Sequence, residues 1–341
     1  MKASSPIAVL GAGSWGTALA VLLARNGQPT VLWGRNAEFM AQLAQMRRNP
    51  RFLPDAAFPE NLQTTDNLAR ALSAASDCLI AVPSHGFRDT LQRLAPHAPT
   101  SLRIACATKG MEPGSGNLPH QVAQEILGAA HPFAVISGPT FAREVAAGLP
   151  AAVTVASQNA EFAAALAARL HSDGFRAYTS DDVTGVELGG AVKNVLAIAA
   201  GIADGLGFGA NTRAALITRG LAEMMRLGVA LGGQRETFMG LAGLGDLVLT
   251  CTDDQSRNRR LGLALARGTP LADALRDIGQ SVEGVATARE VMRLAKTHGI
   301  EMPISEQVCS VLHEGKTPRN AVQSLLQREQ KAETIYSGVT K

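Results

Sequence analysis

The stretch IAVLGAGSWGTALAVLLARNG, over residues 7–27, constrains the fold more than any other part of the chain. A short apolar run is followed at once by Gly11, Gly13 and Gly16, and then by a helix-compatible segment. Glycines in these places permit a tight turn, close approach of the backbone to a pyrophosphate, and close packing of helix on strand. The helix N-terminus adds free N–H groups that favour an anion. The pattern predicts a dinucleotide site, with an ordinary glycine turn as the alternative.

Several further apolar runs in the first half are continuous rather than alternating. Strands of this kind are buried on both faces, as in a parallel sheet covered by helices. Residues 1–180 are therefore predicted to form an α/β, Rossmann-like, doubly wound parallel sheet that binds the dinucleotide. The predicted strands are IAVL (7–10), TVLW (30–33), CLIAV (78–82), LRIAC (102–106), FAVIS (133–137) and AAVTVA (151–156).

The second half has a different pattern. After about Asp181 the β-type runs nearly vanish, and long helix-compatible stretches end at glycines such as Gly232 and Gly299. Because 341 residues are many for one hydrophobic core, we expect a second, all-α domain over residues 181–341 that binds substrate and carries catalytic groups. The polar residues 329–341 at its end are expected to be frayed.

Composition excludes several classes of protein. The formal net charge of +3 is spread along the chain and aromatic residues make up only 4%, so no nucleic-acid partner is expected. No apolar run approaches the roughly 20 residues of a membrane span, and the N-terminus lacks a signal-peptide pattern. The four cysteines have no C-x-x-C spacing, which argues against zinc and against disulfides. We therefore expect a cytoplasmic protein without a bound metal.

The end of the second predicted strand bears on the choice of cofactor. A carboxylate there usually binds the 2′-hydroxyl of NAD, but this strand ends in VLWGRN, with Gly34 and Arg35 instead. An arginine in this place can accommodate the 2′-phosphate of NADP. We therefore expect NADP, with NAD as the open alternative. The competing interpretation of Arg35 is a surface arginine.

The loops that follow the predicted strands should hold the groups that meet a ligand, since ligands bind at the carboxyl ends of parallel strands. The loops that stand out are VPSH (82–85), ATKGME (107–112) and SGPTFAREVAAG (137–148). Each of them also contains ordinary turn residues. Lys109, however, is a cation placed just after a buried strand.

The segment ELGGAVKNVLAIAAGIADGLGFG, over residues 187–209, contains a lysine in an unusual setting. Between Leu188 and Ala203 nearly every residue is small or apolar, and Lys193 carries the only formal charge. An ammonium group buried inside a protein carries a large desolvation cost unless something compensates it. Lys193 is therefore a candidate for chemistry, although a lysine whose ammonium reaches the surface gives the same pattern.

A second motif in the helical half, GLGDLVLTCTDDQSRNRRLG over residues 243–262, supplies Asp246, Thr250, Arg257 and Asn258. Asp246 lies between a glycine turn and apolar residues, which suits either a functional carboxylate or a helix cap. Arg257 beside Asn258 suits a phosphate, because a guanidinium group presents a planar fork of donors. A solvated basic patch is the alternative for these residues.

Together these motifs resemble those of bacterial NAD(P)-dependent glycerol-3-phosphate dehydrogenase. The resemblance runs from about Ile7 to about Leu326 and is carried by GAGSWGTALA, ATKGME, SGPTFAREVAAGLP, GGAVKNVLAIAAGIADGLGFGANTRAALITRGLAEM and GLAGLGDLVLTCTDDQSRNRRLG. The last two motifs are much more specific than the nucleotide fold. The resemblance implies a cytosolic enzyme, usually a homodimer, that reduces dihydroxyacetone phosphate to sn-glycerol 3-phosphate, a phospholipid precursor, with NADPH or NADH.

The resemblance also implies roles for residues by their positions. Lys193 matches the family's proton acceptor, and Asn194 is expected to orient the substrate or the amine. The matching substrate contacts are Lys109, Gly138, Thr140, Lys193, Asp246, Ser256, Arg257 and Asn258. The matching cofactor contacts, beside the glycine turn, are Ser14, Trp15, Arg35, Lys109, Ala142, Arg257 and Glu283, with Ser281 expected beside them. Trp15 stands where other members also carry Tyr or Phe.

The implied chemistry explains why Lys193 lies in an apolar segment. Hydride that reaches a carbonyl carbon leaves an alkoxide, which a proton-donating cation stabilises. Burial and the second cation, Lys109, should lower the pKa of Lys193, while Asp246 should oppose that change. Two other functions fit parts of the sequence. A 3-hydroxyacid dehydrogenase would use a similar lysine but has no need of the DQSRNRR motif, and a non-catalytic NADP-binding sensor needs no buried lysine.

Overall fold

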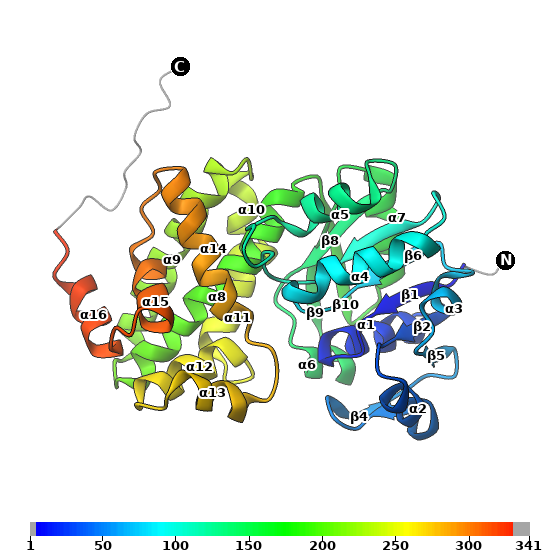
Figure 1. Ribbon diagram of the computed structural model, residues 1–341, viewed down its shortest axis with the longest axis horizontal. Coiled ribbons are helices and arrows are strands. Elements are labelled where there is room, and N and C mark those ends of the chain that lie inside the picture. The colour runs from blue at the N-terminus through cyan, green and yellow to red at the C-terminus, as the bar shows by residue number, and fades with distance from the viewer. Residues whose placement is uncertain (1–4, 330–341) are drawn as a thin grey trace, which may run out of the picture.

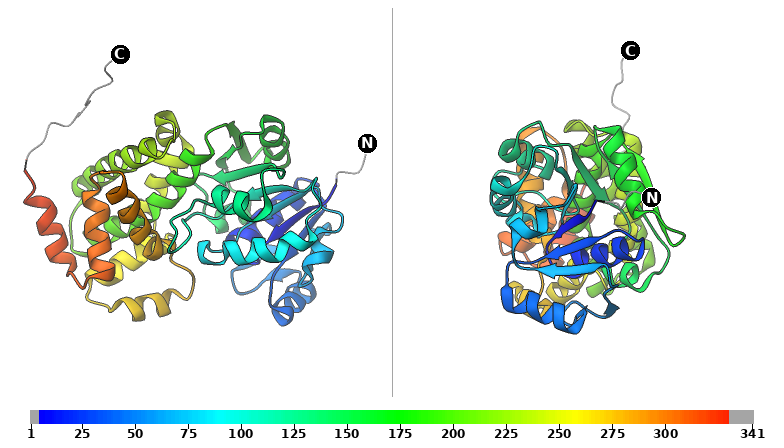
Figure 2. Two further views of the ribbon diagram at one scale, coloured as in Figure 1. Left: turned by 45° about the horizontal axis from the view of Figure 1, so that its top comes forward. Right: turned by 90° about the vertical axis from the view of Figure 1, so that its right-hand side faces the viewer.

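The computed structural model describes residues 5–329, which form two lobes side by side (Figure 1). The N-terminal lobe is a sheet wrapped by helices and the second lobe consists of helices, a division that the left view of Figure 2 also shows. The eight-stranded sheet has the order β10-β9-β8-β7-β6-β1-β2-β5. Its strands are β1 (Ile7–Leu10), β2 (Thr30–Trp33), β5 (Leu62–Thr65), β6 (Asp77–Ile80), β7 (Arg103–Cys106), β8 (Phe133–Ser137), β9 (Ala151–Ala156) and β10 (Phe175–Ser180).

Helices cover both faces of this sheet, so the predicted doubly wound fold is confirmed. Along β1, Ile7 and Val9 belong to one apolar cluster, and Ala8 and Leu10 belong to the other. Both faces of the strand are buried, which is why its sequence is continuously apolar. The first face carries α1 (Ser14–Arg25), α6 (Ala142–Ala147) and α7 (Ala160–Leu170), and the second carries α3 (Leu68–Leu72), α4 (Phe87–Leu94) and α5 (Pro119–Leu127). The lobe also contains α2 (Ala37–Met46) and the short pair β3 (Arg48–Asn49) and β4 (Leu53–Ala57).

In one detail the sheet differs from a wholly parallel one. Strand β9 pairs antiparallel with β8, while β9 and β10 run parallel to each other. A strand that is buried on both faces is apolar in either direction, so its sequence does not encode its orientation. The edge strands β5 and β10 lie outside the predicted runs because they are partly exposed and largely polar.

Helix α8 (Val183–Gly205) forms the centre of the second lobe (Figure 1). A Cβ atom at Gly201 would lie 2.1 Å from the carbonyl oxygen of Arg259, so the close approach of α8 and α12 depends on this glycine. The all-α prediction is confirmed for residues 181–329, and the end of the segment expected to be frayed lies, from residue 330, outside the described residues. The division between residues 180 and 181 stays a prediction. The other helices are α9 (Ala210–Ala230), α10 (Arg235–Met239), α11 (Asp246–Thr252), α12 (Arg257–Ala266), α13 (Leu271–Ile278), α14 (Glu283–Thr297), α15 (Pro303–His313) and α16 (Pro318–Leu326), with a π-helical turn at 241–245.

Helix α8 also corrects the expectation that no apolar run is long enough to span a membrane. Its 23 residues are long and apolar enough by length and composition, and it is the one such helix within residues 5–329. Its most apolar window is 100% buried inside the protein. Helix α8 is thus a core helix of the second lobe, enclosed by other helices.

The glycine turn after β1 packs α1 tightly against the sheet. Gly11 has a φ of 118°, a conformation that favours glycine. A Cβ atom at Gly16 would lie 1.9 Å from the carbonyl oxygen of Gly11, whereas one at Gly13 would meet no atom within 4 Å. Gly11 and Gly16 therefore shape the turn, while Gly13 leaves open space beside the N-terminus of α1.

We predict that Gly16→Ala destabilises the protein by about 1–3 kcal/mol, because the added methyl group forces α1 away from the turn. Gly13→Ala is the matched control and should melt close to the parent temperature, since its methyl group enters open space. Thermal unfolding followed by circular dichroism measures both variants. Equal melting temperatures for the two would show that the turn tolerates a side chain at Gly16.

Candidate active site

Lys193 lies in the middle of α8 and is buried, with 6% of its surface exposed. Its Nζ atom donates hydrogen bonds to Oδ1 of Asp246 at 2.5 Å and to Oγ1 of Thr250 at 2.9 Å, both on α11. The interpretation of Lys193 as a lysine that reaches the surface is therefore wrong. The charge in the apolar segment is compensated by a carboxylate from another helix.

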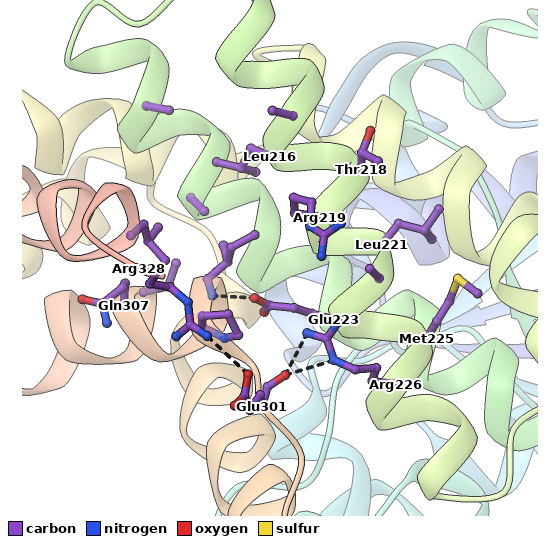
Figure 3. A pocket seen from close by; sticks show the side chains of 18 of the residues that line it. Leu216, Thr218, Arg219, Leu221, Glu223, Met225, Arg226, Glu301, Gln307 and Arg328 are labelled. Atoms are coloured by element: carbon purple, nitrogen blue, oxygen red, sulfur yellow. Dashed lines mark hydrogen bonds and ion pairs between the residues drawn. The ribbon is translucent and has the colours of Figure 1, made fainter. Parts of the chain in front are cut away.

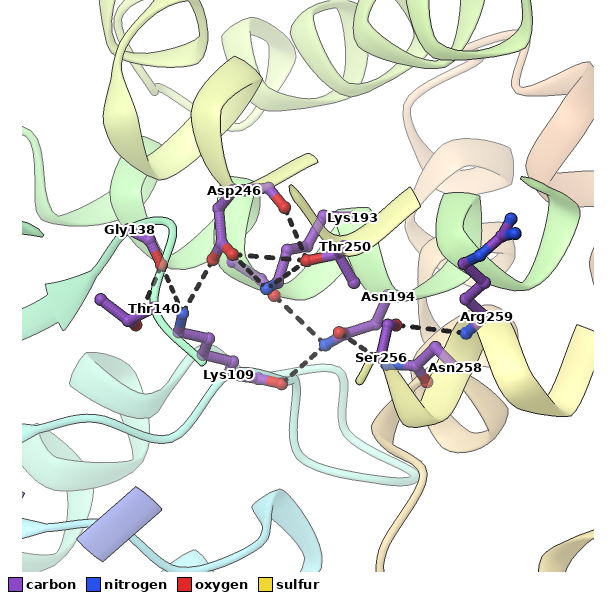
Figure 4. A network of polar contacts seen from close by, with 11 residues as sticks. Lys109, Gly138, Thr140, Lys193, Asn194, Asp246, Thr250, Ser256, Asn258 and Arg259 are labelled. Atoms are coloured by element: carbon purple, nitrogen blue, oxygen red, sulfur yellow. Dashed lines mark hydrogen bonds and ion pairs between the residues drawn. The ribbon is translucent and has the colours of Figure 1, made fainter. Parts of the chain in front are cut away.

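Asp246 binds two lysines at once, one from each lobe (Figure 4). Its Oδ2 atom accepts a hydrogen bond at 2.8 Å from Nζ of Lys109, which also donates to the carbonyl oxygen of Gly138 at 2.9 Å. Lys109 follows β7, whereas Asp246 is the first residue of α11 and is 1% exposed. Its carboxylate bonds the lysines, so the interpretation as a helix cap does not describe it. We refer to Lys109, Lys193 and Asp246 as the charge triad.

The charge triad sets the protonation of its members. Burial lowers the pKa of Lys193 to about 8, the carboxylate of Asp246 opposes this change, and the charge of Lys109 adds to it. Burial alone raises the pKa of Asp246, but the two lysine charges and their hydrogen bonds hold it below its ordinary value. Lys193 can therefore exchange a proton near neutral pH, as an acid–base group requires.

A chain of amides joins the charge triad to the start of α12 (Figure 4). Nδ2 of Asn194 donates to the carbonyl oxygens of Lys109 at 3.1 Å and Gly190 at 3.2 Å. Oδ1 of Asn194 accepts from Nδ2 of Asn258 at 2.8 Å, and Oδ1 of Asn258 accepts from the backbone N–H of Gly284 at 3.0 Å. Both side-chain amides therefore hold backbone and each other in place.

The N-terminus of α12 lies close to these amides. Ser256 is its N-cap, and its Oγ accepts a hydrogen bond from the N–H of Arg259 at 3.2 Å. The next residue, Arg257, is partly buried and donates to the carbonyl oxygen of Ser281 at 2.8 Å. The remaining first-turn N–H groups of a helix favour an anion. The opposite side of the charge triad carries Thr140, whose hydroxyl donates to the carbonyl oxygen of Gly138 at 3.2 Å.

The glycine turn fits a dinucleotide. Helix α1 begins after Gly13 with no side chain capping it, and Ser14 is its first residue. The Nε1 atom of Trp15 is buried and has no hydrogen-bond partner within residues 5–329. Nζ of Lys109 lies 5.9 Å from the centre of the Trp15 ring, which joins the turn to the charge triad. An open anion site and an unused buried donor next to a charged cluster suit a bound cofactor.

The other residues expected at the cofactor lie around this turn. Ala142 begins α6 and packs against the apolar cluster that contains α1. Arg35 is exposed just after β2, so the structure leaves both interpretations of it open. Glu283 begins α14, and its carboxylate accepts hydrogen bonds from the hydroxyls of Ser84 at 2.5 Å and Ser281 at 3.2 Å. Glu283 thus joins the helical lobe to the loop after β6.

Sequence reasoning names Thr250 among the polar residues of its motif but does not single out Ser84. Thr250 lies one helical turn after Asp246 in α11, which brings its hydroxyl next to the same carboxylate. Ser84 lies within the VPSH loop, which was marked as a whole. Its pairing with Glu283 spans the two lobes and has no signal in the sequence.

A groove of about 1220 Å³ lies on the helical lobe (Figure 3), and none of the candidate site residues lines it. It lies between α9, α15 and α16. At its floor the carboxylate of Glu223 accepts hydrogen bonds from the backbone N–H groups of Ile304 at 2.6 Å and Ser305 at 3.1 Å. Glu223 therefore caps the start of α15. Within residues 5–329 no group of His, Cys, Asp and Glu side chains could hold a metal ion.

Comparisons with known proteins identify the family. The sequence profile of the NAD-dependent glycerol-3-phosphate dehydrogenase N-terminus matches residues 6–163, and that of its C-terminus matches residues 182–323. The glycerol-3-phosphate dehydrogenase (NAD(P)+) of Nitrosococcus oceani is 61% identical over 325 residues, which span 95% of this chain and 94% of that protein.

Two further relatives agree. The enzyme of the same name from Stenotrophomonas maltophilia is 58% identical over 327 residues, which span 96% of each chain. The crystal structure of glycerol-3-phosphate dehydrogenase from Coxiella burnetii has a TM-score of 0.92 and 52% identity, covering 95% of this chain and 99% of its own. The chain therefore belongs to the NAD-dependent glycerol-3-phosphate dehydrogenase family and is an NAD(P)-dependent oxidoreductase.

Proposed function

We propose that the chain reduces dihydroxyacetone phosphate to sn-glycerol 3-phosphate with NADPH or NADH, and so supplies glycerophospholipid synthesis. The observation that carries this proposal is the buried charge triad at the junction of the two lobes. Its Lys109 lies 5.9 Å from the ring of Trp15 next to the glycine turn, and the side chain of Asn194, the neighbour of Lys193, is bonded to Asn258 in the first turn of α12. A small phosphorylated ketone has a carbonyl group that could react beside the cofactor turn and a phosphate group that suits the N-terminus of α12.

Lys193 is the proposed proton donor in this direction. When bound, the reduced nicotinamide supplies the hydride that adds to the carbonyl carbon. The carbonyl oxygen gains negative charge and takes a proton from Nζ of Lys193, which Asp246 and Thr250 orient. Lys109 adds a second positive charge next to the developing alkoxide. In the reverse direction the neutral amine of Lys193 accepts the proton.

The remaining residues bind and orient the ligands. Gly11, Gly13, Ser14, Trp15 and Gly16 would hold the pyrophosphate end of the cofactor, with Arg35, Ala142, Ser281 and Glu283 around it. The substrate phosphate would bind at the N-terminus of α12 through Arg257 and first-turn N–H groups, with Ser256 capping the helix. The side chain of Asn258 is bonded to Asn194 and Gly284, so we propose that it keeps this clamp aligned with the charge triad.

The proposal includes the setting of the enzyme. We propose that it works in the cytoplasm and as a homodimer, as the resemblance implies. Val229 and Leu326 support the homodimer, because these large apolar side chains at the edge of the groove are 50% and 75% exposed.

We predict that the purified protein oxidises NADPH in the presence of dihydroxyacetone phosphate and acts at least about 100-fold more slowly on unphosphorylated dihydroxyacetone. A charge-assisted hydrogen bond contributes about 1.5–3 kcal/mol, so losing the phosphate contacts at α12 accounts for this ratio. The absorbance of NADPH follows both reactions. Glyoxylate and 3-hydroxypropanoate (the latter with NADP) are the controls for a hydroxyacid dehydrogenase. Equal rates on the two ketones would refute the phosphate clamp.

We predict that Lys193→Met lowers turnover by at least about 100-fold, the scale expected for losing a positioned acid–base group. The variant should still fold and bind NADPH, because Asp246 keeps Lys109 as its counter-ion. Lys193→Arg should restore little, since a guanidinium does not deprotonate at these pH values. Steady-state rates, a melting curve and an NADPH titration test each variant.

The pH dependence of the parent enzyme follows from the same lysine. Because the pKa of Lys193 is about 8, its protonated form, which reduction needs, is lost as the pH rises through 8. The rate of reduction should fall there, and the rate of glycerol 3-phosphate oxidation should rise. Near-parental turnover in Lys193→Met, or the same pH profile in both directions, would contradict the assigned role.

We predict that Arg35→Asp raises the Michaelis constant for NADPH by about 10- to 100-fold and leaves that for NADH nearly unchanged. A charge-assisted contact to the 2′-phosphate contributes roughly 1.5–3 kcal/mol, and NADH lacks this phosphate. Steady-state kinetics with each cofactor measure the two constants. If the NADPH constant stays at the parental value, Arg35 is only a surface residue.

A further inference from the structure

We propose that Glu290 of α14 is a positioning residue for Lys109, because it fastens the loop that carries this lysine to the helical lobe. The proposal rests on the proposed function, in which Lys109 assists Lys193. We call residues 107–118, between β7 and α5, the lysine loop. Glu290 lies outside every motif singled out in the sequence, and it does not contact the charge triad.

Glu290 binds the backbone of the lysine loop directly. Its Oε1 atom accepts a hydrogen bond from the N–H of Gly114 at 2.7 Å, and the residue is 6% exposed. Its Oε2 atom accepts from the guanidinium of Arg293 at 3.0 Å, and Arg293 donates in turn to the carbonyl oxygen of Ser115. A buried carboxylate and its arginine therefore hold two consecutive residues of the loop.

The rest of the lysine loop also belongs to the helical lobe by its contacts. Met111 and Leu118 are 0% and 4% exposed and pack in the apolar cluster built around α8. The carbonyl oxygen of Lys109 accepts a hydrogen bond from Asn194 of α8. Although the loop continues a strand of the N-terminal lobe, these contacts attach it to the opposite helices. Glu290 is a carboxylate of the helical lobe that binds the backbone of this loop.

On its other side the loop is tied to the N-terminal lobe. The carboxylate of Glu112 accepts hydrogen bonds from Arg88 of α4 at 2.5 Å and 3.0 Å. If the bond to Glu290 is lost, this tie remains and draws the loop toward the N-terminal lobe. Lys109 then moves relative to Asp246, which stays in the helical lobe. This is how a residue outside the charge triad controls the geometry inside it.

Displacing Lys109 has a consequence that a loss of stability alone does not have. The charged and titratable groups that face Lys193 are Asp246, Lys109 and Cys251. Lys109 lowers the pKa of Lys193, and it also shares the carboxylate of Asp246. When Lys109 moves away, Asp246 interacts with Lys193 alone and the pKa of Lys193 rises. The acid limb of glycerol 3-phosphate oxidation, which needs neutral Lys193, should therefore move to higher pH.

The test compares Glu290→Ala, Glu290→Gln and Glu223→Ala in the full-length protein. Glu290→Ala removes the acceptor for Gly114, whereas Glu290→Gln keeps an oxygen in its place. Glu223→Ala is the matched control, because Glu223 is also a buried carboxylate that accepts backbone N–H groups, but in the groove away from the charge triad. Two measurements are made: hydrogen exchange of the loop amides without substrate, and the pH profile of glycerol 3-phosphate oxidation.

We expect Glu290→Ala to speed hydrogen exchange in residues 107–118, to lower kcat at least about tenfold and to move the acid limb up by about one pH unit. Glu290→Gln should keep kcat within about twofold of the parent, and the acid limb of its pH profile should lie at the parental pH. Glu223→Ala should lower the melting temperature without changing the loop exchange or the limb. If Glu290→Ala does not fold, Glu290→Asp, which is one methylene shorter, takes its place.

The outcomes separate this proposal from the proposed function. Unchanged loop exchange, or an acid limb that stays in place in Glu290→Ala, overturns the positioning role. An equal shift of the limb in Glu223→Ala also overturns it, because the shift would then follow from stability alone. A parent protein that does not oxidise glycerol 3-phosphate at all refutes the proposed function instead, and the loop exchange still reports whether Glu290 holds the lysine loop.

Discussion

The carboxylate of Asp246, shared between two lysines, is the interaction on which the rest of the site depends. With both lysines protonated, the charge triad holds one net positive charge in a place that water barely reaches. Such a group is costly to bury, and removing Asp246 would leave two lysine charges uncompensated. Because Lys109 comes from the N-terminal lobe and Asp246 and Lys193 come from the helical lobe, the arrangement exists only when the lobes are packed together.

Much of the fold could be predicted from the sequence because burial on both faces leaves a clear pattern. Strands β1, β2 and β8 coincide with the predicted apolar runs, and Gly11 and Gly16 form the tight turn and the close helix packing that were expected. The direction of β9 could not be predicted, since the apolar pattern of a strand is the same for a parallel and an antiparallel orientation. The polar edge strand β10 was missed for a related reason, because a half-exposed edge does not require an apolar run.

The candidate site was predictable where one residue departs from its surroundings. Lys193 is a single charge in an apolar helix, and Asp246 is a carboxylate in an apolar turn, so both could be found in the sequence. Their pairing could be anticipated only in general terms. The hydrogen bonds of Ser84 to Glu283 and of Gly114 to Glu290 join residues that are far apart in the chain. None of these residues is of an unusual type for its place in the sequence. Contacts of this kind need the folded chain.

Helix α14 makes both of those contacts, and this has a consequence for how the lobes can move. Positions 283 and 290 are seven residues apart, and a helix rises by a constant amount, so the two attachment points are held about 10 Å apart. The helix thus fixes the distance between its contact with the loop after β6 and its contact with the lysine loop. Because both acceptors lie on one helix, they move together when one lobe rotates relative to the other. A motion that carries α14 away from these two loops therefore has to break the hydrogen bonds at both points.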